Sequence, residues 1–180
     1  MKKCLALLVA LIFLPTLFAR AATPPDFLVT GFKIDDLISL DPAEIFEFTG
    51  AEYAANTYGR LINYDVDNVS EISGGIAESW EVGEDQQTYT FHIRKGIHFA
   101  SGNPLTAADV VYSLVRTVKL NLSPAFIITQ FGFTPDNVES KIFTTDDYTV
   151  KIVVDKPYAP TLVLYCLTST PASVVDRVLV

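Results

Sequence analysis

Few side chains in this sequence have the types and spacing that catalysis or metal binding requires. The two histidines, His92 and His98, fall in or beside expected strands and match no metal-binding motif. The adjacent carboxylates at 35–36 and 146–147 fall at expected turns, and nothing sets the members of either pair apart as acid and base. No GxSxG motif or glycine-rich phosphate loop is present. We therefore expect no catalytic residues, no metal and no cofactor.

The cysteines leave two interpretations open. Cys4 precedes an N-terminal apolar run, and Cys166 lies within the apolar sequence LVLYCL. A free cysteine packs as a small hydrophobe, which favours a buried and unreactive Cys166. A disulfide to a cysteine beyond residue 180 is the alternative.

The first 21 residues resemble an export signal. Lys2 and Lys3 precede an apolar run over 5–18, and small residues follow at Ala19 and Ala21. The run is shorter than the roughly 20 residues that span a bilayer. We predict a cleaved signal peptide at 1–21 and an exported chain from 22 to 180.

The chain is acidic, with 13 Lys and Arg against 21 Asp and Glu and a net charge of −8. The signal carries three of the cations, Lys2, Lys3 and Arg20, and no acid. A negative chain does not attract phosphate backbones, so nucleic acid is not an expected partner.

Local patterns predict the elements that would position any site. Residues 27–33 are rich in aromatic and β-branched side chains, which favours a strand. Helical spacing predicts a helix over 51–62, capped by Thr49 or Gly50. Residues 65–75 are polar and are expected to form a loop.

The clearest pattern is a hairpin of strands 78–82 and 87–94 around a turn at 83–86. Its second strand alternates polar residues with an apolar set, as a half-buried strand requires. The apolar set is Tyr89, Phe91 and Ile93.

Further elements follow in mixed order. A short strand is expected at 97–100, and Thr106 with Asp109 resembles a capping box that opens a helix. The buried stripe of this helix is expected to be Val110, Val111, Leu114, Val115 and Val118.

A loop over 121–135 is expected to follow this helix. A second hairpin is predicted over 138–143 and 148–154, and a helix from Thr161. The apolar run at 174–180 suggests that the chain is truncated, with a terminal strand docked in a sheet as the alternative.

Five sequence blocks, in order, resemble the family 5 solute-binding proteins, the dipeptide and oligopeptide receptors of ABC importers. The blocks are SLDP at 39–42, YGRLI at 58–62, GIAESWEV at 75–82, YTFHIRKGIHF at 89–99 and SGNPLTAADVVYS at 101–113. Arg60 departs from the glycine usual in the second block, and Ala100-Ser101 replaces the usual acidic residue before a turn glycine.

The resemblance implies an α/β fold, with the chain forming part of lobe one of a two-lobed periplasmic-binding-protein-like structure. The implied lobe contains a mixed sheet with antiparallel hairpins. It also implies a periplasmic, non-enzymatic protein that captures a peptide between its lobes and docks on ABC importer permease subunits. The same scaffold binding a sugar, nickel or an opine stays open, as does a truncated product without transport activity.

By position in the family, the ligand contacts come from two segments. One follows the LDP motif, where an extended peptide could pair with the main chain, and the other follows the helix opened at Thr106. The implied residues are Ile45, Phe46, Glu47, Phe48, Thr49, Ser123, Pro124, Ala125 and Phe126. The alternative for the three phenylalanines is a position in the core.

Overall fold

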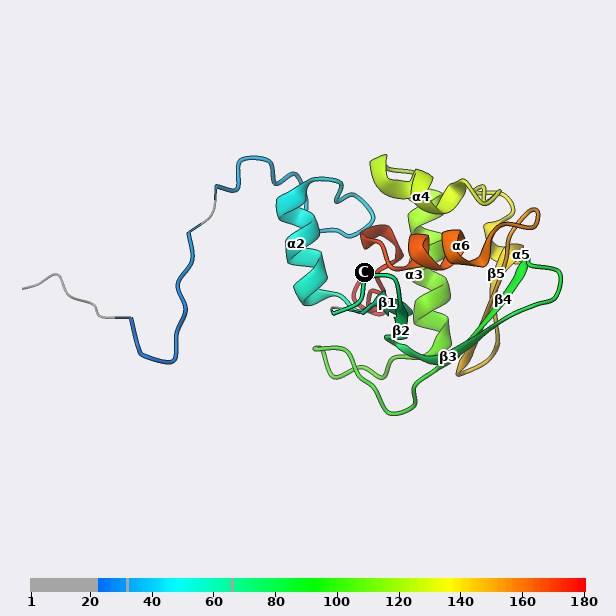
Figure 1. Ribbon diagram of the computed structural model, residues 1–180, viewed down its shortest axis with the longest axis horizontal. Helices are drawn as coiled ribbons and strands as arrows, with labels where there is room; N and C mark the ends of the chain where they lie inside the picture. The colour runs from blue at the N-terminus through cyan, green and yellow to red at the C-terminus, as the bar shows by residue number, and fades with distance from the viewer. Residues whose placement is uncertain (1–22, 32, 66) are drawn as a thin grey trace, which may run out of the picture. The chain divides into compact units, whose positions relative to one another are not determined.

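The computed structural model describes residues 23–31, 33–65 and 67–180 (Figure 1). The predicted signal peptide at 1–21 lies outside the described residues. The chain divides into two compact units, 1–34 and 35–180.

In the first unit, the described residues form no strand, so the strand predicted at 27–33 is wrong. A turn is present instead, in which the Phe27 amide donates to the Pro24 carbonyl at 3.0 Å. A strand is stabilised by a partner ladder, and β-propensity without one does not make a strand.

The second unit holds helices and strands in mixed order, as predicted. Its elements are α2 (Phe48–Thr57), β1 (Ile62–Tyr64), β2 (Ile72–Gly74), β3 (Ala77–Val82), β4 (Thr88–Ile93), α3 (Ala107–Leu120), η2 (Ser123–Ala125), α4 (Phe126–Thr129), α5 (Val138–Lys141), β5 (Ile142–Asp146), β6 (Thr149–Val153), α6 (Pro160–Leu167) and η3 (Thr170–Ala172).

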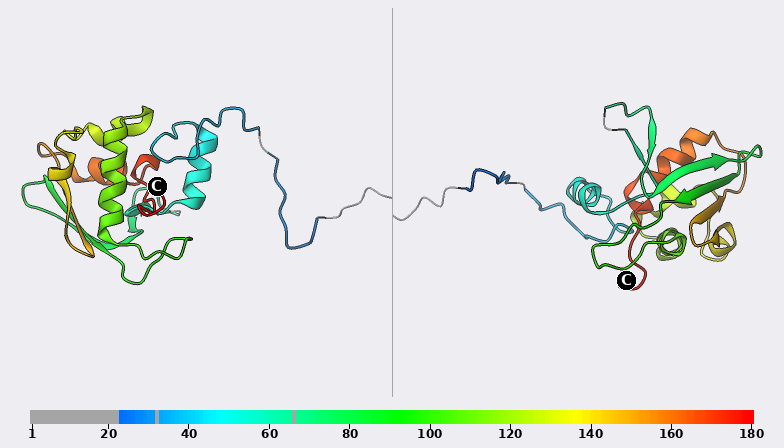
Figure 2. Two further views of the ribbon diagram at one scale, coloured as in Figure 1. Left: turned by 180° about the vertical axis from the view of Figure 1, so that it is seen from behind. Right: turned by 90° about the horizontal axis from the view of Figure 1, so that it is seen from below.

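Four strands form one antiparallel sheet in the order β3-β4-β6-β5, and β1 and β2 form a separate ladder (Figures 1 and 2). In β4 the apolar set Tyr89, Phe91 and Ile93 is buried, while the intervening residues are half-buried. The predicted first hairpin and its alternation are therefore confirmed.

Helix α3 packs against β5 and β6 and contributes Val110, Leu114 and Val118 to the core. Its capping box is formed by the side chains of Thr106 and Asp109, as predicted. The helix ends at Asn121, which adopts the left-handed conformation that asparagine tolerates at a helix end.

The helix predicted over 51–62 is shifted, because α2 runs from Phe48 to Thr57 with Glu47 at its N-cap. It ends where the chain begins to pair with a distant segment. The Gly59 carbonyl accepts from the Val174 amide at 2.9 Å, and Arg60 forms a bridge with Ser173. This pairing requires extended backbone after the helix.

Three further boundaries differ from prediction. The expected loop at 65–75 contains β2, which pairs with β1. Residues 97–100 form a bridge between His98 and Pro104 and no strand. The second hairpin starts at Ile142, since α5 occupies the four residues before it.

Within the apolar run at 174–180, Val174 and Val175 are buried, whereas Val178, Leu179 and Val180 are exposed. The Val175 amide donates to Ser113 Oγ at 2.9 Å, so the buried part of this run is docked beside α3 without forming a strand. Among the described residues, no helix is both long and apolar enough to cross a membrane.

Candidate functional site

The segment after the LDP motif is held by Asp41. One Asp41 carboxylate oxygen accepts from the Ala43 amide at 3.0 Å, and the Asp41 carbonyl accepts from the Ile45 amide at 3.0 Å. The same carboxylate receives two hydrogen bonds from the Arg116 guanidinium on α3. The predicted ligand segment thus starts from a turn that is fixed to the core helix.

Glu47 shapes the turn into α2. Its two carboxylate oxygens accept from the backbone amides of Ile38 at 3.2 Å and Phe46 at 2.9 Å. Partial burial acts to raise the pKa of Glu47, but these amides prevail and hold it below its usual range. The carboxylate is therefore directed to its own backbone.

The two predicted segments meet at Phe46 and Phe126. Their ring centroids are 5.6 Å apart and the rings lie edge to face at 84°. Phe46 is 61% exposed and Phe126 is 55% exposed, so neither belongs to the core. Phe48 is also exposed. The interpretation of these three rings as core residues does not hold.

Other predicted residues support these rings. Ile45, Pro124 and Ala125 are buried, and Ser123 opens the short turn η2 that presents Phe126. Thr49 donates through its hydroxyl to Asp36 at 2.5 Å. Whether any of the nine residues contacts a ligand stays a prediction.

The main chain of the segment is open on its acceptor side. The amides of Ile45, Phe46 and Thr49 already donate within the unit. The carbonyls of Ile45 and Phe46 accept no hydrogen bond from the part of the chain that the structure describes. An incoming N–H group could therefore pair with these two carbonyls, whereas the amides of Ile45, Phe46 and Thr49 are not free to donate to an incoming carbonyl.

A cavity of 440 Å³, which we call the Arg60 cavity, adjoins this segment. Its lining comes from residues 45–48, the exposed side of α2, Arg60, Tyr64, Ile127 and residues 168–171. Its size falls within the usual range for small-ligand sites. The sequence singled out Arg60 as a departure from the family pattern but not as a site residue.

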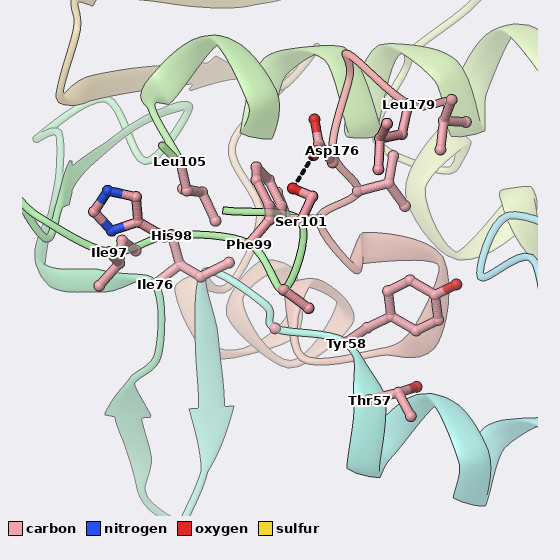
Figure 3. Close-up of a pocket in the computed structure, with 15 residues that line it drawn as sticks. Thr57, Tyr58, Ile76, Ile97, His98, Phe99, Ser101, Leu105, Asp176 and Leu179 are labelled. Atoms are coloured by element: carbon pink, nitrogen blue, oxygen red, sulfur yellow. Dashed lines mark hydrogen bonds between the residues drawn. The ribbon is translucent and has the colours of Figure 1, made fainter. Parts of the chain in front are cut away.

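A second cavity of 460 Å³ is lined by Ser101, His98 and Asp176, residue types that form catalytic triads in other proteins (Figure 3). Ser101 donates directly to Asp176 at 2.6 Å, and His98 Nδ1 lies 3.1 Å from the Gly96 carbonyl. His98 therefore does not act as a base for Ser101, and the acceptor of the Ser101 hydroxyl is a carboxylate with a lowered pKa, which is a weak base for activating a nucleophile. The hydrogen bond from Ser101, with that from Asn103, lowers the pKa of Asp176.

Cys166 on α6 is half-buried and is not in a disulfide with another described residue. Gln130 Nε2 lies 3.5 Å from its sulfur, and burial raises the pKa of the thiol. A raised pKa keeps the thiol protonated and unreactive. No cluster of metal-ligating side chains occurs within 23–31, 33–65 and 67–180.

Residues 71–178 match the model of the family described as bacterial extracellular solute-binding proteins, family 5 Middle. The chain belongs to this family. The match includes all of η2 and α4, whereas residues 45–49 and Arg60 lie before it. The family assignment therefore confirms the resemblance without identifying ligand contacts in the first segment.

Among the relatives of this chain, the "Probable D,D-dipeptide-binding periplasmic protein DdpA" of Escherichia coli K12 is 34% identical over 161 residues. The match covers 88% of this chain and 29% of that protein. The chain thus spans less than a third of this relative's length.

Solved structures agree with the periplasmic-binding-protein fold. The murein tripeptide binding protein MppA of Escherichia coli has a TM-score of 0.64 at 29% identity, covering 78% of this chain and 29% of that one. AgaA from A. tumefaciens R10, in complex with agropinic acid, has a TM-score of 0.66 at 28% identity, with 78% and 26% covered.

Proposed function

We propose that this chain supplies one wall of the ligand cleft of a periplasmic peptide-binding protein that delivers its ligand to an ABC importer. The observation that carries this proposal is the meeting of residues 45–49 with 123–126 at the Phe46–Phe126 contact. Exposed aromatic side chains beside free main-chain acceptors suit an extended peptide.

The open carbonyls of Ile45 and Phe46 would accept from peptide N–H groups, and the two rings would contact side chains without selecting one shape. Main-chain pairing with an apolar surface gives broad specificity. The protein binds and does not catalyse. A second lobe closes over the ligand by a hinge motion, and the closed form docks on the permease subunits.

This wall alone is expected to bind weakly, because the contacts of a second lobe and the closure are missing. Titrating di- to tetra-alanine into the isotopically labelled chain should shift NMR signals of 45–49 and 123–126 with millimolar affinity. Phe46→Ala should weaken these shifts, and Leu162→Ala, which removes an exposed side chain from α6, should not.

Two results would contradict the proposal. Micromolar binding by calorimetry would show that one wall suffices, and peptide shifts confined to other surfaces would place the site elsewhere. The alternative of a non-peptide solute is favoured by the similarity to AgaA, whose structure was solved in complex with agropinic acid. Shifts of the same residues by a sugar or an opine, without shifts by peptides, would support it.

A further inference from the structure

Arg60 is a buried cation without a partner in the described part of the chain. The residue is only 9% exposed, and its Nε–H is buried without a hydrogen-bond acceptor. Its guanidinium forms no ion pair with a described residue, whereas Arg116 and Arg177 each have a carboxylate. Arg60 therefore differs from these two arginines, because no carboxylate of a described residue balances its positive charge.

The position of Arg60 is fixed by its backbone. Its carbonyl accepts from the Ile76 amide at 2.8 Å, and it bridges to Ser173. Burial lowers the pKa of the guanidinium, but an arginine keeps its charge in proteins. A guanidinium that is fixed, largely shielded from water and without an ion pair is a strong site for an anion, because removing water strengthens its attraction.

The surroundings favour an anion over a cation. Glu47, the acid on the wall of the Arg60 cavity, directs both carboxylate oxygens to backbone amides. Thr170 lines the same cavity, and its hydroxyl makes no hydrogen bond to the described residues. The cavity thus offers a planar cation and a spare hydroxyl, which together match the two oxygens of a carboxylate.

We propose that Arg60 binds a carboxylate of the ligand, so that the protein selects peptides carrying one near this wall. This inference rests on the proposed peptide-binding function and deepens it. The carboxylate is either the C-terminal group of a short peptide or an acidic side chain, and the experiment separates these two sources.

The first measurement follows the Nε–H signal of Arg60 by NMR while acetate replaces chloride at constant ionic strength. We expect a saturating shift of this signal. Arg94 provides the matched control, because its guanidinium is exposed and lines none of the cavities described above. Arg60→Met should abolish acetate binding, and Arg94→Met should leave it unchanged.

The second measurement compares Ala-Ala, Ala-Ala amide and Ala-Glu amide. If Arg60 binds the C-terminal carboxylate, Ala-Ala should bind at least about tenfold more tightly than Ala-Ala amide. If Arg60 binds an acidic side chain, Ala-Glu amide should bind more tightly than Ala-Ala amide by the same factor. In either case the preference should vanish in Arg60→Met, persist in Arg94→Met and be partly retained in Arg60→Lys.

The outcomes distinguish the two proposals. A preference for carboxylates that persists in Arg60→Met overturns the role of Arg60. Peptide binding without any effect of acetate on the Nε–H signal of Arg60 overturns this role as well. Acetate binding at Arg60 without any peptide shift at 45–49 or 123–126 leaves the anion site standing and overturns peptide binding. The absence of both signals overturns both.

Discussion

The guanidinium of Arg116 on α3 donates two hydrogen bonds to the carboxylate of Asp41, one of them 2.9 Å long. Asp41 belongs to the LDP motif and starts the turn that leads to Phe46. This ion pair therefore connects the candidate ligand wall to the core helix, and it gives the motif a positioning role.

Replacing Arg116 with Met should leave Asp41 without its cation. The two side chains are 20% and 33% exposed, so solvent screens part of their attraction. We expect the free energy of unfolding to fall by about 1–2 kcal/mol, between the values for surface and buried pairs. Urea denaturation measures this loss. Arg94→Met should change it little, and an equal loss in both variants would contradict the specific role of the pair.

Acid should weaken the same connection. The hydrogen bond from Arg116 is the main cause that lowers the pKa of Asp41. A carboxyl with a lowered folded pKa stabilises the fold above its unfolded pKa of about 3.9, and this stabilisation is lost as the pH falls through the folded value. Urea midpoints should therefore drop below about pH 4.

Asp41→Asn should flatten part of that acid dependence. Asp176 has its pKa lowered by Ser101, so some dependence should persist in the variant. Midpoints of the unsubstituted protein that stay constant from pH 5 to pH 2 would contradict the expectation.

The sequence predicted elements whose local pattern agrees with their packing. The alternation in 87–94 identified β4, because Tyr89, Phe91 and Ile93 alone face the core. Thr106 with Asp109 identified the start of α3, since a capping box is made by neighbours in sequence. Both signals are local, and tertiary contacts support them.

Elements set by distant contacts could not be predicted in this way. The end of α2 depends on pairing of Gly59 and Arg60 with 173–174, which no local period contains. The site shows the same limit. The family resemblance indicated both ligand segments, but the contact between Phe46 and Phe126 and the burial of Arg60 appear only in the fold.

The Phe46–Phe126 contact should contribute more to ligand binding than to stability. Both rings are more than half exposed, so a double-mutant cycle with alanine should give a coupling free energy below about 1 kcal/mol in unfolding. Either single variant should weaken peptide shifts at 45–49. A stability loss of core size, about 3 kcal/mol or more, would show that the rings act as core residues.

Arg60→Met should stabilise the free protein while removing its response to carboxylates. The substitution replaces an unpaired, buried cation by an apolar side chain of similar length, which removes a desolvation cost. We expect the free energy of unfolding to rise by about 1 kcal/mol, measured by urea denaturation without ligand.

Adding acetate should then raise the unfolding free energy of the unsubstituted protein and of Arg94→Met, but not of Arg60→Met, because only a bound ligand shifts the equilibrium. Arg94→Met should itself lower stability by no more than about 1 kcal/mol, the usual contribution of the hydrogen bond that its Nε donates to the Gly75 carbonyl. A marked loss of stability in Arg60→Met would show that the apolar stem of Arg60 holds the cavity together. The expected desolvation cost of the Arg60 charge would then be wrong, and the response to acetate alone would decide whether this charge binds a carboxylate.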